Sequence, residues 1–210
     1  PWDQRLCLVP DGDLFTAISA GSASVVTDHI ETFTETGLRL RSGAELQADV
    51  IVTATGLNLL ALGGMQIALD GQEVELSQTM SYKGMMLGGI PNMAFAVGYT
   101  NASWTLKCDL VCQYVCRLLN HMDNGGYTQC TPRRDPSIGE LPFIDFSSGY
   151  VLRAIEKFPK QGSKAPWRLH QNYPLDILNL RYGKVEDGTM EFSTRSATTV
   201  AESEPAALAV

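Results

Sequence analysis

The sequence has little positive charge, and this shortage narrows its range of partners. Its 210 residues include 16 Lys and Arg against 23 Asp and Glu, which gives a formal net charge of −7. Nucleic-acid binding requires a basic surface, so this balance argues against nucleic acid as a general partner. The sequence also has no uninterrupted apolar run approaching the ~20 residues of a membrane-spanning helix, so we expect no transmembrane segment.

The start of the sequence lacks the features of a secretory signal. It begins with Pro1, Trp2 and Asp3, without an initiator Met and without a charged start followed by an apolar segment. We therefore expect a cytoplasmic protein whose N-terminus was processed, or a piece of a longer protein.

Cysteine is present, but not in a metal-binding or redox pattern. The count of five is odd, which favours reduced thiols over a disulfide framework. Cys108, Cys112 and Cys116 recur at every fourth position and would line one stripe of a helix. No CxxC motif occurs, and the nearest histidine is His121, so a closed set of metal ligands is missing. We interpret the stripe as small buried hydrophobic residues and expect no metal.

The motifs of several large enzyme classes are also missing. The sequence contains no GxSxG, HExxH, GxxxxGK[ST] or GxGxxG. His29, His121 and His170 have no nucleophile near them in the sequence, so we interpret each as structural or exposed. The catalytic residues therefore stay unknown at this level.

The N-terminal quarter has the pattern of a short helix followed by strands. Residues 11–20 favour a helix with Asp11 or Asp13 as its cap, and residues 24–27 favour a strand. From residue 30 onward, apolar and polar residues alternate between turns at Thr36-Gly37 and Ser42-Gly43. This pattern predicts a small antiparallel meander.

Two apolar runs suggest strands buried on both faces. Residues 50–52 form a continuous apolar run that ends in Ala54-Thr55-Gly56, and residues 93–97 form a second one. The small residues after the first run would let a ligand or another backbone approach, although a strand end leaving the sheet explains them too. Between the two runs, Asp70-Gly71 predicts a hairpin.

The most informative unit is the strand at 93–97, Gly98, a small polar turn and a long helix. Apolar residues recur at helical spacing from Leu106 to Leu119, Asn101 or Ser103 can cap the start, and Gly125-Gly126 ends the helix. The unpaired N–H groups and positive dipole end of such a helix attract an anion or an electron-rich carbonyl. A plain strand-to-helix turn is the equally open alternative.

After Gly126 the sequence is rich in proline. Helices are plausible over residues 148–158 and 173–182, the second with Pro174 in its first turn. Residues from Ser193 onward are rich in Thr, Ala and Ser, and we expect them to be disordered.

The chain resembles the C-terminal portion of class B flavin-dependent monooxygenases, the family of flavin-containing and Baeyer–Villiger monooxygenases. The resemblance extends roughly to Phe192, and its most specific block is Gly98-Tyr99-Thr100-Asn101-Ala102-Ser103-Trp104-Thr105-Leu106-Lys107. The other matching stretches are residues 2–7 and 10–15, Ala48–Leu57, Tyr82–Met86, Pro91-Asn92, Asp145–Tyr150 and Lys160–Trp167.

The resemblance implies an α/β fold, the C-terminal part of a flavoprotein with two Rossmann-like domains that bind FAD and NAD(P). Residues 1–55 would end the NADP-binding domain and residues 56–126 would close the FAD-binding domain. Residues 127–192 would be a helical and loop extension, and residues 193–210 a disordered tail. By the same resemblance, Thr53, Ala54, Thr55 and Gly56 would form a hinge near NADP, and Gly98, Tyr99, Thr100, Asn101, Ala102 and Ser103 would lie beside the flavin.

The reaction implied by the resemblance starts from NADPH, FAD and O2. A flavin peroxide would oxygenate a small substrate, which is a ketone in a Baeyer–Villiger reaction or a soft N or S centre of an amine or sulfide. Both GxGxxG phosphate cradles of the family are absent here, so we expect a fragment that is inactive alone.

A disulfide reductase would need a redox Cys pair, which is missing. A scaffold or interaction domain derived from half a flavoprotein stays open.

Overall fold

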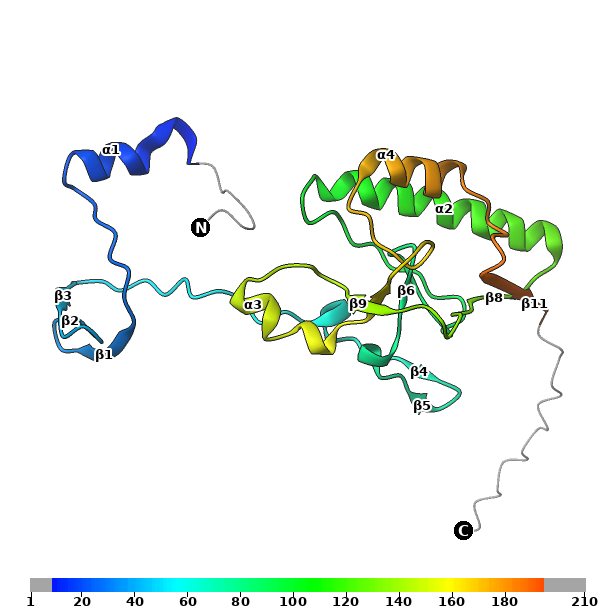
Figure 1. Ribbon diagram of the computed structural model, residues 1–210, viewed down its shortest axis with the longest axis horizontal. Coiled ribbons are helices and arrows are strands. Elements are labelled where there is room, and N and C mark those ends of the chain that lie inside the picture. Colours follow the sequence, from blue (N-terminus) through cyan, green and yellow to red (C-terminus); the bar gives the residue numbers. More distant parts are fainter. Residues whose placement is uncertain (1–8, 195–210) are drawn as a thin grey trace, which may run out of the picture. The chain divides into compact units, whose positions relative to one another are not determined.

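The structure is a computed structural model, which describes residues 9–194 (Figure 1). The chain divides into two units, Pro1–Leu57 and Asn58–Val210, and each is described by itself. The division falls two residues after the expected domain boundary at residues 55 and 56, whereas the assignment of nucleotide domains to these parts stays a prediction. The matching stretch at residues 2–7 and most of the expected tail, residues 195–210, lie outside the described range. Ser193, expected to begin that tail, is the last residue of a strand.

The first unit contains a short helix and a three-stranded antiparallel sheet. A 3-10 turn η1 (Pro10–Gly12) leads into α1 (Asp13–Ser19), and the sheet has the order β1 (Ile30–Thr34), β2 (Gly37–Leu40), β3 (Glu45–Gln47). Leu40 is buried, while Arg39 between the two β2 leucines pairs with Glu45 across the sheet at 3.0 Å. The predicted helix and meander are therefore confirmed. The predicted cap, Asp11 or Asp13, is wrong, because Gly12 occupies the N-cap position and no side chain caps the helix.

Two strands predicted in this unit are absent. Residues 24–27 form no strand, and neither does the apolar run at 50–52. The expected burial of that run is also wrong, because Val50 and Val52 are 79% and 84% exposed. A strand obtains its hydrogen bonds and its burial from neighbouring strands. No strand in residues 9–194 pairs with this run.

The second unit is built on one long helix and several two-stranded pairs. Its elements are η2 (Ala61–Gly64), β4 (Ala68–Leu69), β5 (Gln72–Glu73), η3 (Leu76–Gln78), β6 (Ser81–Tyr82), β7 (Met86–Leu87), α2 (Trp104–Gly125), β8 (Gln129–Pro132), β9 (Glu140–Pro142), α3 (Gly149–Leu152), η4 (Ile155–Lys157), β10 (Lys160–Gly162), α4 (Tyr173–Asp176), η5 (Ile177–Tyr182) and β11 (Met190–Ser193). The pairs are β4–β5, β6–β7, β8–β11 and β9–β10, all antiparallel.

The chain thus has the helices and strands of the expected α/β class, but the part described contains no parallel Rossmann sheet. The predicted hairpin at Asp70-Gly71 is confirmed by β4 and β5. The predicted buried strand at 93–97 is wrong, because that segment is irregular and makes no ladder with a neighbour. A parallel strand needs adjacent strands to bond to, and none is paired with it here.

Helix α2 carries the core of the second unit. One face buries Leu110, Val111, Tyr114 and Leu118 against residues of the β6–β7 hairpin and against Trp167. The helix ends where predicted, because Gly126 adopts a left-handed conformation (φ 66°) that suits glycine and closes the last turn. In Figure 1, α4 and the segment after it run alongside α2, in agreement with the contacts between these elements.

The cysteine stripe on α2 does not contribute to this core. Cys112 and Cys116 are exposed and Cys108 is half-buried, so the interpretation of the stripe as buried hydrophobic residues is wrong. The buried stripe is the adjacent one that contains Val111, Tyr114 and Leu118. Each step along a helix turns by about 100°, and the cysteines therefore fall beside the core face.

The two helices expected after residue 126 have different outcomes. The first, over 148–158, is broken into α3 and η4 around Arg153 and Ala154. The second is confirmed as α4 followed by η5, a π-helical turn. Asn172 caps α4 by accepting a hydrogen bond from the Leu175 N–H at 3.0 Å.

Arg117 of α2 binds the C-terminal end of η5. Its guanidinium donates to the carbonyl oxygens of Leu180 at 2.8 Å and Arg181 at 2.7 Å. Terminal carbonyls of a helix lack partners within the helix, so this contact satisfies them from outside.

Candidate functional site

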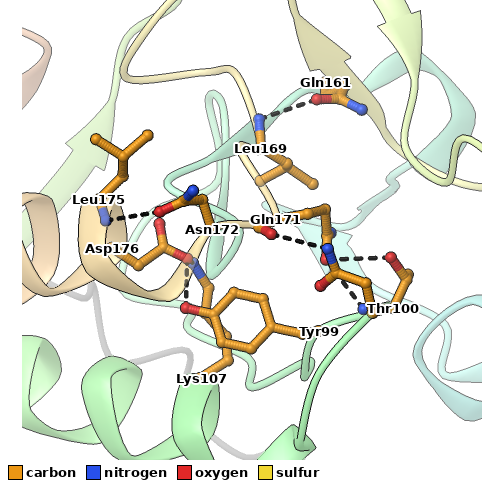
Figure 2. Close-up of polar contacts among 10 residues, drawn as sticks. Tyr99, Thr100, Lys107, Gln161, Leu169, Gln171, Asn172, Leu175 and Asp176 are labelled. Carbon is orange, nitrogen blue, oxygen red and sulfur yellow. Dashed lines mark hydrogen bonds and ion pairs between the residues drawn. The ribbon is translucent and has the colours of Figure 1, made fainter.

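The turn Gly98–Ser103 joins the irregular segment at 93–97 to α2. Gly98 and Tyr99 are buried, whereas Asn101, Ala102 and Ser103 are exposed. Figure 2 shows Tyr99, Thr100 and Lys107 facing a segment that contains Gln171, Asn172 and Asp176. The turn therefore has one side packed against the C-terminal part of the unit and one side that is open.

Gly98 is required by the start of the helix. A Cβ at this position would overlap the Cα, Cβ and Cγ atoms of Trp104. The space beside Gly98 is therefore occupied by Trp104, the first residue of α2. The small size of Gly98 explains the tight connection to α2, and it is no evidence for a ligand.

Tyr99 belongs to a buried polar group with Asp176 and Lys107. The Tyr99 hydroxyl donates to Asp176 Oδ2 at 2.6 Å, and Lys107 Nζ approaches the same oxygen at 2.8 Å. Lys107 Nζ also lies 5.6 Å from the centre of the Tyr99 ring. Burial, followed by the hydrogen bond to Asp176 and its charge, raises the pKa of Tyr99. Tyr99 thus anchors α4 to the start of α2.

Thr100 and Asn101 bind the segment just before α4. The Thr100 N–H and hydroxyl donate to Gln171 Oε1 at 2.9 and 3.2 Å, and the Asn101 side-chain amide donates to the Gln171 carbonyl at 3.0 Å. Three of the six residues expected beside a flavin therefore hold the chain's own C-terminal segment in place.

The start of α2 is left without a side-chain cap. Ser103 occupies the N-cap position, but it makes no capping hydrogen bond, and its hydroxyl pairs with the Thr105 hydroxyl at 2.8 Å. Asn101, the other expected cap, is engaged with Gln171 instead. No acidic residue lies in the first turn, so no carboxylate of the helix itself compensates the positive end of its dipole. This exposed start can accept an electron-rich group.

The expected hinge residues Thr53, Ala54, Thr55 and Gly56 lie near the end of the first unit. All four are exposed, and they belong to no helix or strand. Gly56 has a φ of 106°, which favours glycine. The structure therefore groups the ten predicted site residues into two sets, one in each unit.

A second polar network, buried at its two tyrosines, lies in the larger unit. Tyr82 donates to Asp187 Oδ2 at 2.7 Å, and its hydroxyl lies 3.2 Å from that of Tyr114. Lys83 Nζ is 3.1 Å from Asp187 Oδ2 and 4.8 Å from the centre of the Tyr114 ring.

Burial shifts the ionisation of this network. Burial raises the pKa of Tyr114 to about 12 and also raises the pKa of Tyr82. Burial lowers the pKa of Lys83, against the opposing effect of Asp187. Burial acts to raise the pKa of Asp187, but the Tyr82 hydrogen bond and the Lys83 charge outweigh it, and the net shift is downward. The tyrosines are therefore hydroxyl donors at neutral pH.

The partners Asp176, Gln171 and Asp187 were not predicted from the sequence. Asp176 is 69 residues from Lys107 and 77 from Tyr99, and no spacing rule connects such distant positions. One signal was available, because Lys107 precedes Val111, Tyr114 and Leu118 on the same helical stripe. A lysine on a buried stripe requires a counter-charge.

Residues 9–194 contain no group of three or more His, Cys, Asp or Glu side chains placed to hold a metal ion. Within the same range, none of the helices combines the length and apolarity needed to cross a membrane.

Comparison with known proteins gives close matches over almost the whole chain. It is 60% identical over 198 residues to the FAD-containing monooxygenase EthA of Mycobacterium tuberculosis H37Rv, and 54% identical over 204 residues to EthA of Mycolicibacterium smegmatis. It is 50% identical over 201 residues to a protein of Acinetobacter sp. named "Probable FAD-binding monooxygenase AlmA". These matches cover 94%, 97% and 95% of this chain and 40%, 42% and 40% of the relatives.

The chain therefore spans about two fifths of the length of these relatives. No sequence profile of a known protein family matches it. The identities confirm the resemblance to flavin-dependent monooxygenases, over part of the length of those proteins.

Proposed function

We propose that this chain, a homologue of part of the FAD-containing monooxygenases, functions as a segment of an FAD- and NADPH-dependent monooxygenase. The whole enzyme would insert one oxygen atom from O2 into a ketone or into a soft N or S centre. The observation that carries the proposal for this segment is the exposed, uncapped start of α2, in the block that most resembles the flavin enzymes.

The start of α2 fits the electron-rich carbonyl side of a flavin ring. FAD, when bound, supplies the redox chemistry with O2. The backbone N–H groups of the first turn, from Trp104 onward, would face the ring and stabilise the negative charge that it gains on reduction. A helix N-terminus typically contributes ~0.3–1 kcal/mol to such a charge, and up to ~2 kcal/mol when it is partly buried.

The remaining predicted residues have supporting roles in this proposal. Tyr99, Thr100 and Asn101 would hold the turn in shape through Asp176 and Gln171. The exposed Ala102 and Ser103 would leave the helix start accessible. Residues 53–56 would form the hinge beside NADP.

The proposal also has a negative consequence for the isolated chain. The sequence contains no GxGxxG, so it lacks the glycine-rich loop that binds a dinucleotide pyrophosphate. We expect the 210-residue chain alone to bind FAD weakly and to have no oxygenase activity.

The test compares this chain with the longest natural protein that contains it. The longer protein should purify with the visible absorption of oxidised flavin and consume NADPH and O2 in the presence of ketones or thioethers. The 210-residue chain should purify colourless. A longer protein without flavin would contradict the proposal and would favour the scaffold alternative, and stoichiometric FAD on the short chain would contradict the division of roles.

A matched pair of substitutions tests the role of the helix start. Ala102→Asp places a carboxylate beside the N-terminus of α2, whereas Ala44→Asp places one on an exposed turn of the first unit. In the longer protein, the first variant should make the reduction potential of the flavin more negative because it repels the reduced ring. Equal flavin reduction potentials in the two variants would show that the start of α2 does not lie beside the flavin.

A further inference from the structure

The larger unit contains a pocket lined by more positive than negative side chains. Its volume is about 300 Å³, and its charged lining comes from distant parts of the chain. These charged residues are Lys83, Lys107, Arg168, Lys184, Asp176 and Asp187. The pocket therefore carries four cationic groups against two carboxylates in a chain whose net charge is −7.

The two carboxylates are already neutralised by lysines of the same pocket. Lys107 Nζ lies 2.8 Å from Asp176, and Lys83 Nζ lies 3.1 Å from Asp187. The side chains of both lysines are only 9% exposed, so these pairs are fixed parts of the wall.

Arg168 and Lys184 are the two cationic residues of the pocket that are not paired with these carboxylates. Neither has a carboxylate partner among residues 9–194, and neither side chain makes a hydrogen bond to another described residue. Arg168 is partly buried and Lys184 is exposed, so both can reach a molecule that enters from solvent. Two unpaired cations on one pocket attract an anion of matching charge.

The rest of the lining is largely apolar. Ala165, Pro166, Leu169 and Leu180 form part of the wall, and the volume lies at the lower end of the range for small-ligand pockets. A ligand that fits has an anionic head for Arg168 and Lys184 and a small apolar body for these side chains.

We propose that this pocket binds a small organic phosphate. A phosphate dianion matches the surplus of two positive charges, and the planar guanidinium of Arg168 can donate two parallel hydrogen bonds to its oxygens. The pocket shares Lys107 and Asp176 with the network behind the start of α2, but Arg168 and Lys184 are not part of that network, so phosphate binding does not require bound flavin.

The experiment is calorimetric titration of the 210-residue chain at constant ionic strength. The probes are phenyl phosphate, inorganic phosphate and benzoate. Phenyl phosphate should bind one-to-one and more tightly than benzoate. Inorganic phosphate that binds as tightly as phenyl phosphate overturns the proposal of an organic ligand, because the apolar wall would then add nothing to the affinity. Binding of neither phosphate, or tighter binding of benzoate, overturns the proposal.

Charge-matched variants separate the site from general electrostatics. Arg168→Gln with Lys184→Gln should weaken phenyl phosphate by about tenfold or more, because both charged donors are lost. Arg39→Gln with Arg133→Gln removes the same charge from exposed ion pairs elsewhere and should leave the affinity unchanged. Equal affinity in the two double variants overturns the proposal. Lys184→Glu alone, at an exposed position without a partner, should also weaken binding and keeps the test available if the double variant does not fold.

Discussion

At the scale of single residues, the larger unit depends on buried charges that are satisfied from distant segments. Lys107 would be costly on the buried face of α2, and it is tolerated because Asp176 lies 2.8 Å away. Asp176 in turn accepts from Tyr99 at 2.6 Å. The three side chains connect the start of α2 to α4. A substitution of one of them therefore removes a polar partner from at least one of the others.

We predict that Asp176→Asn lowers the free energy of unfolding by about 3–5 kcal/mol, because it leaves the Lys107 charge buried without a counter-charge. Urea unfolding monitored by circular dichroism measures this loss. The control is Arg133→Gln, which breaks an ion pair whose two side chains are 57% and 62% exposed and should cost about 0–1 kcal/mol. Similar losses in both variants would contradict the role of Asp176.

Asp187 gives a prediction on pH. Its pKa is lower in the folded chain than the ordinary value of 3.8, so the unfolded state takes up a proton first as the pH falls. The stabilisation from this carboxylate is complete above the ordinary pKa and is lost as the pH falls through the lower folded pKa. Asp187→Asn should therefore make the free energy of unfolding less dependent on pH below about pH 5. An unchanged slope in acid titrations of stability would contradict this account.

At the scale of elements, the position of α2 is set by its two ends. Gly126 ends the helix with a left-handed residue, and Gly98 lets the preceding turn pass directly against Trp104. The first turn itself is uncapped, so its placement depends on the contacts of Tyr99, Thr100 and Asn101 with the segment before α4.

We predict that Gly98→Ala destabilises the larger unit by about 1–3 kcal/mol, the usual cost of overpacking, because the new methyl overlaps backbone and side-chain atoms of Trp104. The matched control is Gly139→Ala, whose methyl would meet only Ser163 Oγ at 3.4 Å and Cβ at 3.6 Å. Thermal unfolding should separate the two variants, and equal midpoints would show that the turn relaxes freely.

At the scale of the whole molecule, the chain is two units joined by a stretch without secondary structure. Residues 48–60 contain no helix or strand, and Val50, Val52, Leu57 and Leu60 in it are all more than 60% exposed. A backbone without ladder partners opens readily, which makes this stretch a natural site of cleavage.

Limited proteolysis should therefore cut first between residues 48 and 60. We expect a low-specificity protease to release the larger unit while α2 stays intact, because the core face of that helix is buried. Mass spectrometry of the first products locates the cut. Initial cleavage within α2 would show that the larger unit is the less stable part.

The sequence by itself determined the elements whose signals are local. The meander after residue 30, the hairpin at Asp70-Gly71 and the bounds of α2 follow from alternation, helical spacing and glycine, all of which act within a few residues. The resemblance to flavin monooxygenases was also readable from short motifs such as the block at 98–107, and the comparisons confirm it.

Only the tertiary structure decided which residues meet. The runs at 50–52 and 93–97 have strand-like composition, but a strand exists only where a neighbour supplies its hydrogen bonds, and composition does not encode that neighbour. The partnership of Lys107 with Asp176, 69 residues away, is of the same kind. Long-range pairs form because folding brings buried charges together, and their energy depends on a geometry that the order of residues does not contain.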